Sequence, residues 1–342
     1  MPYNGLEVEM FGVGAADCIL DTRWMNSVAA RVLIDGAHAG DTETILARLQ
    51  ARRITHLDHV VCSHPHDDHA AGLVGIVRSP AVTIGRLWMH LPWAHINLPN
   101  LLASLNRVDG LKIVRVVKAS LTTAQELFQA AQRRGIPVVE PFDGQHIGPL
   151  YVCGPSVAFY TSLLTGFADF DRLYEYEEAF AAHDRLLHRE KLVAEGAWSI
   201  GGQVVAESEG ELGAEPTEPE NDASAILTAA HGAERILLTA DAGVAALNEA
   251  KGRYVLSNLA WMQIPHHGSR RNLTQALVEY FKPGVAFVSA DGSRHHPRRK
   301  VVNAFKGQGT RVFSTHHPNV VDLRQWFGDV PVRAGAVAAT PL

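Results

Sequence analysis

Short apolar runs alternate with amphipathic segments along most of this chain, and polar residues stand where several of the runs end. Residues 28–34 and 59–63 are rich in aliphatic side chains, many of them β-branched, which favours buried strands. Between them, residues 41–53 place three aliphatic side chains on one face of a helix. The same alternation returns in the second half of the chain. We therefore predict an α/β fold whose strands end in loops that carry the chemistry.

The remaining elements are predicted by the same two periodicities. Further strands are expected at residues 6–11, 15–20, 225–229, 235–239, 261–265, 285–290 and 311–314, and the clearest further helix at 121–134. Residues 157–205 are helical in character, and residues 206–220 are acidic, poor in aliphatic residues and expected to be a mobile loop. The simplest organisation is a single domain over residues 1–342, with a helical insertion at 156–222 that ends in an acidic flexible loop.

Composition narrows the class of protein. The chain has 342 residues, 46% apolar and 20% charged, as in an ordinary soluble globular protein. No apolar run has the roughly 18–20 residues of a membrane span, and residues 1–14 do not resemble a signal peptide. Cys18, Cys62 and Cys153 are expected to be buried free thiols, which favours a cytoplasmic protein. With a net charge of −5, the chain lacks the positively charged surface that a general nucleic-acid binder usually has.

A cluster of histidines follows the strand predicted at 59–63. His64, His66, Asp68 and His69 form the pattern H-x-H-x-D-H. Two histidines at i and i+2 in an extended loop project to the same side, so both can reach one ion. The adjacent Asp68 and His69 can reach a second ion nearby. Imidazole and carboxylate suit Zn²⁺, with Mn²⁺ or iron as alternatives, so we predict a site for one or two of these ions.

Two further predicted strands also end in groups that can bind metal. Asp241 follows the strand at 235–239, and His266 and His267 follow the strand at 261–265. Asp241 can bridge two ions through its two oxygens, and one of the two histidines can bind the second ion. The sequence leaves open which histidine that is.

In this order the motifs resemble the metallo-β-lactamase superfamily, and more narrowly the soluble hydrolase-like domain of the ComEC-type competence proteins. The residues that carry the resemblance are Leu33–Gly36, Ser63–Leu73, Asn221–Ser224, Leu237–Asp241, Ile264–Ser269 and His296-Pro297. They extend over nearly the whole chain. The resemblance implies a four-layer αββα sandwich with metals at one edge between the sheets, and the activity of a metal-dependent hydrolase. The membrane-channel part of the competence proteins has no counterpart here, so a role in DNA uptake is not implied.

One metal-binding histidine that the resemblance implies is absent from the sequence. Many superfamily members have a further histidine after the central strand pair, whereas residues 151–155 offer none. His146 precedes that strand and is expected at the surface, and Asn221 is a weak substitute. The first ion is therefore expected to be loosely held, or to complete its shell with water or substrate. Asp35 is expected to orient a metal-binding histidine by a hydrogen bond rather than to bind metal.

Basic residues gather around the same motifs in an otherwise acidic chain. They are Arg270, Arg271, Arg294, Arg298, Arg299 and Lys300. Cations at the rim of a metal site predict an anionic substrate, drawn in by the local field, although ordinary solvated charge gives the same pattern. His296 and Asp17 match family positions near the metals. We expect both of them to contact the substrate, together with Arg270, Arg271, Arg294 and Asn221.

The leading hypothesis is metal-assisted hydrolysis, in which a metal-bound hydroxide attacks phosphorus or a carbonyl carbon. Asp68 is expected to bind metal and orient the nucleophile, and His296 to assist catalysis. The resemblance and the basic residues together favour a phosphodiesterase or nuclease that acts on nucleic acid or a nucleotide.

Two alternatives remain open. Hydrolysis of an ester, thioester, lactone or lactam would be favoured by an apolar pocket lined by Trp88, Trp93 and Phe142. A metal-bound interaction module without turnover is disfavoured because every predicted metal ligand is retained. Gly12-Val13-Gly14 lacks the third glycine of a dinucleotide-binding loop, so a Rossmann-type site is excluded.

Overall fold

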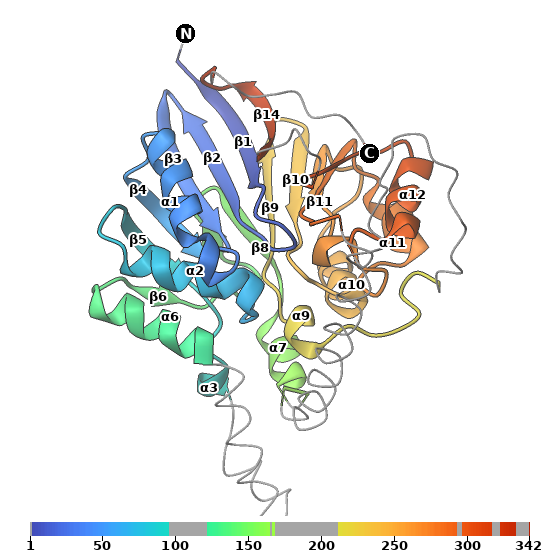
Figure 1. The fold of residues 1–342 in the computed structure, drawn as a ribbon. Helices are drawn as coiled ribbons and strands as arrows, with labels where there is room; N and C mark the ends of the chain where they lie inside the picture. The colour runs from blue at the N-terminus through green and yellow to red at the C-terminus, as the bar shows by residue number, and fades with distance from the viewer. Residues whose placement is uncertain are drawn as a thin grey trace, which may run out of the picture.

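The computed structural model describes residues 2–95, 122–164, 166–167, 211–292, 296–316, 322–332 and 342. Within these residues, two seven-stranded sheets lie face to face, and helices cover their outer faces (Figure 1). The predicted αββα sandwich is thereby confirmed. None of the helices described is both long and apolar enough to cross a membrane.

The first sheet is built mainly from the N-terminal half of the chain. Its strands, in order across the sheet, are β14 (Asp322–Asp329), β1 (Asn4–Phe11), β2 (Ile19–Met25), β3 (Val28–Ile34), β4 (His56–Val61), β5 (Thr83–Trp88) and β6 (Val138–Val139). The pairs from β3 to β6 are parallel, and those from β14 to β3 are antiparallel. The outer layer consists of η1 (Ala39–Asp41), α1 (Thr42–Ala51), α2 (Asp67–Arg78), α3 (Pro92–His95) and α6 (Thr122–Arg133).

The second sheet comes from the C-terminal half. Its order is β13 (Arg311–Ser314), β12 (Val285–Val288), β11 (Trp261–Gln263), β10 (Glu234–Leu238), β9 (Ile226–His231), β8 (Leu150–Gly154) and β7 (His146–Ile147). The strands from β10 to β13 are parallel. They are accompanied by α10 (Val244–Arg253), η2 (His266–Gly268), α11 (Gln275–Phe281) and α12 (Arg299–Gly307), with α7 (Val157–Leu163) and α9 (Pro219–Asp222) at one end of the sandwich (Figure 1).

The continuous apolar runs follow from burial of the strands on both faces. In β3, Val32 and Ile34 pack into the core between the sheets, whereas Leu33 packs against the helices outside. Successive side chains of a strand point to opposite faces, so a strand covered on both sides needs apolar residues at every position. Trp261 of β11 is the largest fully buried side chain of the inner core.

Most predicted elements are present, and the differences have physical causes. The strand expected at 15–20 begins only at Ile19, because residues 12–18 form a loop that folds back toward the strand ends. β14 was not predicted, because its sequence is largely polar and it is a strand at the sheet edge. The acidic stretch is not solvated at its end, since Glu220 is 3% exposed. Residues 168–210 of the proposed insertion lie outside the described residues.

Candidate metal centre

The predicted metal-binding residues meet where parallel strands of both sheets end. His64 and His66 lie in the loop after β4, and Asp68 and His69 lie in the first turn of α2. This helix was not predicted from the sequence, and an aspartate in its first turn is stabilised by the helix dipole. Asp241 follows β10 in the opposite sheet.

His266 and His267, after β11, form a turn with unusual backbone angles. Both have positive φ, 48° and 51°, although left-handed backbone costs a residue with a side chain about 1–2 kcal/mol. Gly268 follows at φ 83°, and a Cβ there would lie 2.7 Å from the Cβ of Pro297. The glycine of the His-His-Gly motif is therefore required by both its backbone conformation and its packing.

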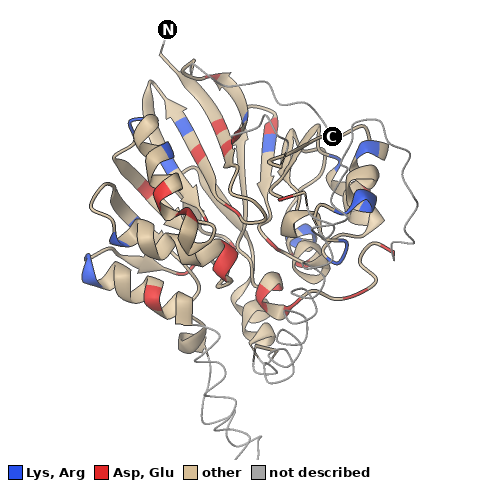
Figure 2. Ribbon diagram, viewed as in Figure 1, with Lys and Arg blue, Asp and Glu red and all other residues tan. Residues whose placement is uncertain are grey.

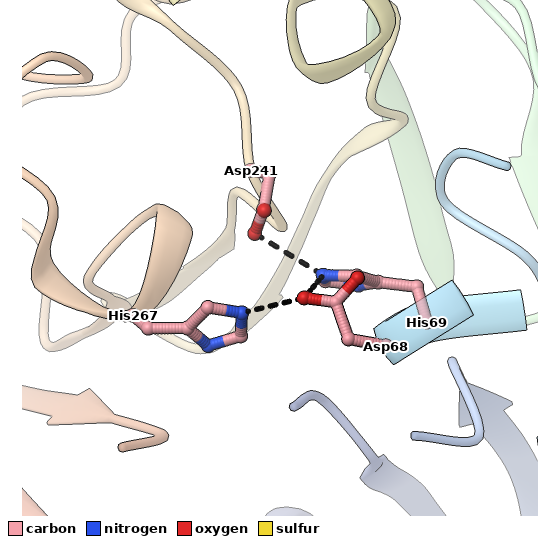
Figure 3. Close-up of side chains that lie close together, drawn as sticks. All are labelled: Asp68, His69, Asp241 and His267. Carbon is pink, nitrogen blue, oxygen red and sulfur yellow. Dashed lines mark hydrogen bonds and ion pairs between the residues drawn. The ribbon is translucent and has the colours of Figure 1, made fainter. Parts of the chain in front are cut away.

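Four of the predicted ligands form a tight cluster. The ligand atoms of Asp68, His69, Asp241 and His267 all lie within 4.8 Å of one another (Figure 3). His69 Nε2 is 3.3 Å from Asp241 Oδ1 and 3.8 Å from Asp68 Oδ2. His267 Nε2 is 3.2 Å from Asp68 Oδ2. These are the separations expected for donors that share one ion, since tetrahedral ligands at zinc distances lie about 3.3–3.6 Å apart.

On the other side of Asp241 lies a second, more open group. His64 Nε2 is 3.9 Å and His266 Nε2 is 3.6 Å from Asp241 Oδ2. The His66 ring centroid is 4.7 Å from that of His64. The two oxygens of Asp241 thus face two different sets of imidazoles, which fits the predicted bridge between two ions.

Hydrogen bonds at the back of the rings decide which ring nitrogen carries the proton. His69 Nδ1 lies 2.8 Å from the Asp35 carboxylate, and His267 Nδ1 lies 3.2 Å from the main-chain oxygen of Ser289. Both partners are acceptors, so each Nδ1 must donate. The Nε2 atoms face the carboxylates of Asp68 and Asp241, where they hold a proton in the metal-free protein and offer a lone pair to a metal ion once that proton is lost.

The same reasoning applies to His64. Ser63 Oγ donates its single proton to Asp35 Oδ2 at 2.7 Å, so Ser63 Oγ can only accept from His64 Nδ1, 3.1 Å away. Among the described residues, His64 Nε2, His69 Nε2 and Asp241 Oδ1 are buried without a hydrogen-bond partner. Buried lone pairs that face one another need a cation between them. The donor set therefore fits divalent metal ions.

The protonation states agree with this interpretation. Burial lowers the pKa of His64 well below its usual value, helped by His69 and His66, so this ring is neutral and ready to bind metal. Burial also lowers the pKa of His267, but Asp241, the hydrogen bond to Asp68 and Asp17 together raise it to about 9. Without metal, a proton on His267 takes the place of the cation.

Asp17 and Asp35 lie beneath the cluster rather than at its rim. Asp35 accepts hydrogen bonds from Ser63 and His69, as the sequence predicted. Asp17, expected to contact substrate, is 1% exposed and accepts hydrogen bonds from Gln263 and Ser289. Burial raises the pKa of Asp17, against the effect of His267 and His69.

The residues predicted to contact substrate differ in their surroundings. Arg270 and Arg271 both pair with Glu215, at 2.9 and 3.0 Å, and Arg294 lies outside the described residues. The His296 ring stacks 5.6 Å from His266, and burial, with the nearby His267 and His266, lowers its pKa to about 3.

Asn221 and Asp67 make their contacts with polar side chains nearby. Asn221 is buried, and its amide nitrogen donates to Thr217 at 2.8 Å and lies 3.4 Å from His266 Nδ1. Asp67, beside the expected ligand Asp68, accepts a hydrogen bond from Thr123.

Several functional residues were not anticipated. Gln263, Ser289 and Asn272 support the predicted ligands, and Glu218 lies 3.7 Å from His66 Nε2. Gln263 had a signal in the sequence, because a glutamine in an otherwise apolar buried strand needs a polar partner. The others gave none, because serine, asparagine and glutamate are ordinary residues in the loops where they lie.

Comparisons with known proteins agree with the fold. Residues 27–150 match the model of the Metallo-beta-lactamase superfamily. The match supports membership of that superfamily. A comparison with curated proteins finds no match.

Three solved structures are similar to this chain over most of its length. The metallo-beta-lactamase fold protein YhfI from Bacillus subtilis is 10% identical, with 95% of this chain and 100% of that chain covered and a TM-score of 0.44. The hydrolase AbOPH is 10% identical over 97% and 98% of the two chains, with a TM-score of 0.36. The dizinc quorum-quenching lactonase AidC is 11% identical over 95% and 79%, with a TM-score of 0.34. Likenesses at this level do not bear on the substrate.

Proposed function

We propose that this protein is a metal-dependent hydrolase with two divalent ions, one on each side of Asp241. The observation that carries the proposal is the set of imidazole Nε2 atoms that face the carboxylates of Asp68 and Asp241. One ion would be held by Asp68, His69, His267 and Asp241 Oδ1. The other would be held by His64, His66, His266 and Asp241 Oδ2, so both histidines of the His-His-Gly motif are ligands.

The residues around the ions define the chemistry. Divalent ions in such a shell lower the pKa of bound water toward neutrality and so supply hydroxide at pH 7. Asp68 is 26% exposed at its side chain, whereas His69 is fully buried, so Asp68 is the ligand placed to orient a nucleophile at the open side. Zn²⁺ is the first expectation for a shell rich in imidazole, with Mn²⁺ or iron as alternatives.

A phosphodiester is the substrate class we favour, in nucleic acid or a nucleotide. Basic residues lie on α12 and in the loop between η2 and α11 (Figure 2). The main-chain N–H of Arg298 donates to the main-chain oxygen of Gly268 at 3.0 Å, so the start of α12 adjoins the His-His-Gly turn. The narrower likeness to ComEC-type proteins, carried by Asn221–Ser224 and Ile264–Ser269, supports the same class. Arg270 and Arg271 add less, because Glu215 already balances them.

The apolar pocket that would favour lactone or ester hydrolysis is not supported. Trp88 packs between the sheets, Trp93 packs against Phe128 on the outer face, and Phe142 packs against Tyr160. These three aromatic residues pack in three separate hydrophobic clusters.

The test is metal analysis of the purified protein beside a substrate panel. The panel contains bis-p-nitrophenyl phosphate, single- and double-stranded DNA, RNA, cyclic dinucleotides and a lactone, each assayed with Zn²⁺ and Mn²⁺. We expect about two ions per chain and cleavage of a phosphodiester. Cleavage of the lactone alone would support a metal-dependent hydrolase but reject a phosphodiester as its substrate. A protein that takes up no metal would reject the whole proposal.

Asp68→Ala separates an enzyme from a binding module. The variant should lose turnover while His64, His66 and His266 still hold one ion. If biological function survives in this variant with metal bound, the protein is an interaction module.

A further inference from the structure

Asp17 is a buried carboxylate that accepts hydrogen bonds from two side chains, and each of these in turn holds a candidate metal ligand or the turn before it. It lies in the loop between β1 and β2, is 1% exposed, and its main-chain N–H donates to the main-chain oxygen of Asp68 at 3.2 Å. Its two carboxylate oxygens take different partners, Ser289 on Oδ1 and Gln263 on Oδ2. Each partner leads to a different candidate metal ligand.

The Ser289 branch leads to His267. Ser289 Oγ donates its proton to Asp17 Oδ1, so it can only accept from His267 Nδ1, which lies 3.1 Å away. Together with the main-chain oxygen of Ser289, this arrangement holds the His267 ring with its proton on Nδ1. His267 Nε2 is then directed toward Asp68, 3.2 Å away.

The Gln263 branch leads to Asp241. Gln263 Nε2 donates to Asp17 Oδ2 at 2.8 Å, which fixes the orientation of the amide. The amide oxygen is then free to accept from the main-chain N–H groups of Thr239 and Ala240, at 3.1 and 3.0 Å. Ala240 has a left-handed backbone, with φ 44°, and Asp241 follows it directly. Gln263 therefore stabilises the turn that directs the Asp241 carboxylate into the centre.

We propose that Asp17 is a positioning residue that holds Asp241 and His267 in place for metal through Gln263 and Ser289. This inference rests on the proposed function. Asp17 Oδ2 also lies 3.8 Å from His69 Nδ1, behind the Asp35 hydrogen bond. Asp17 thus links ligands from both sheets. Removal of a group that orients metal ligands costs about 10–100-fold in metal affinity.

The experiment titrates the full-length protein, freed of metal, with Co²⁺ and records the visible spectrum, which reports coordination geometry. Asp17→Asn is compared with wild type and with Asp21→Asn. Asp21 is a matched control, because it is a fully buried carboxylate of the neighbouring strand β2 with no hydrogen-bond partner among the described residues. We expect Asp17→Asn to weaken Co²⁺ binding at least about 10-fold and to shift the spectrum, and Asp21→Asn to match wild type.

Wild-type affinity and spectrum in Asp17→Asn would overturn the inference and leave the proposed function intact. A wild-type protein that binds neither Co²⁺ nor Zn²⁺ would overturn both. If Asp17→Asn does not fold, Ser289→Ala and Gln263→Met each remove one of the two hydrogen bonds through which Asp17 acts. We expect Ser289→Ala to weaken one of two Co²⁺ equivalents and Gln263→Met to weaken both, since Asp241 faces both ions. Unchanged binding in both variants would reject the role of Asp17.

Discussion

Asn272 and His266 fix each other's hydrogen-bonding groups. The amide nitrogen of Asn272 donates to the main-chain oxygen of Asp241 at 2.7 Å, so its oxygen must face the ring. That oxygen lies 3.0 Å from His266 Nδ1, which therefore donates. The Nε2 lone pair of His266 is left pointing at Asp241 Oδ2, 3.6 Å away.

Replacing Asn272 with leucine should weaken one ion selectively. Asn272→Leu keeps the branched shape but leaves a buried carbonyl and a ring N–H unpaired, at a cost of about 1–3 kcal/mol. We expect the ion next to His266 to bind about 10–100-fold more weakly, with the other ion retained. Isothermal titration with Zn²⁺ measures both sites. Asn248→Leu, an exposed asparagine on α10, is the control, and equal loss of both ions would contradict the assignment.

The two histidines of the turn should be separable by metal content. His266→Ala should lose the ion shared with His64, and His267→Ala should lose the ion shared with Asp68 and His69. Each variant is then expected to carry about one ion per chain against about two in wild type, as measured by elemental analysis after dialysis. If His266→Ala keeps both ions, His266 is a neighbour of the centre and not a ligand.

Metal binding should release protons, and its affinity should rise with pH. Burial lowers the pKa of His267, but Asp241 and the hydrogen bond to Asp68 raise it to about 9, so below that pH the metal-free ring carries a proton. A metal ion must displace this proton, so affinity should increase up to about pH 9 and then level off. Titration calorimetry in buffers of different ionisation enthalpy counts the protons released. A count of zero at pH 7 would be the contrary result.

Asp21 should make the folded protein less stable as pH rises. Burial raises the pKa of this carboxyl from 3.8 to about 8, with Glu7 adding to the effect and Arg23 opposing it. Between these values the folded protein keeps a proton that the unfolded chain has lost, so the free energy of unfolding falls with rising pH. Asp21→Asn should remove this dependence on pH. Between pH 4 and pH 8, the free energy of unfolding of the variant should rise by up to about 5 kcal/mol relative to that of wild type. Urea unfolding at both pH values is the measurement, and parallel curves for the two proteins would refute it.

Glu215 should control access to the two arginines. Glu215→Gln removes the carboxylate that Arg270 and Arg271 share. If these arginines lie on the substrate path, KM for a phosphodiester should fall several-fold at low salt, and the difference should vanish at high ionic strength. Glu279→Gln, on the exposed face of α11, is the control for a general change in charge. An unchanged KM in Glu215→Gln would place both arginines outside the substrate path.

Local patterns in the sequence predicted most of the strands and helices and pointed to the residues of the candidate metal centre, whereas the four layers were implied by the resemblance. His64, His66, Asp68 and His69 are close in sequence, so their spacing alone indicates a shared site. Asp241 was accessible to prediction because it directly follows an apolar strand. The order of these motifs along the chain carried the resemblance to the superfamily.

Pairings between distant residues were not predictable. Asp17 and Gln263 are separated by 246 residues, and only the stacking of the two sheets brings them together. The pairing of Glu215 with Arg270 and Arg271 likewise depends on how the acidic segment crosses the second half of the chain. The left-handed backbone at His266 and His267 was not predictable either, because a positive φ is uncommon for any residue with a side chain.

The position of Asp241 opposite His69 has a consequence for the lifetime of the protein. His69 lies in α2 beside the first sheet and Asp241 follows β10 of the second, so an ion between them would cross-link the two halves of the chain. A metal ion whose free concentration is about 100 times its dissociation constant stabilises the folded protein by about 2.7 kcal/mol. This lowers the unfolded fraction about 100-fold. A cell short of the metal would therefore lose the protein itself to proteolysis, in addition to its activity. The supply of the ion would set its abundance.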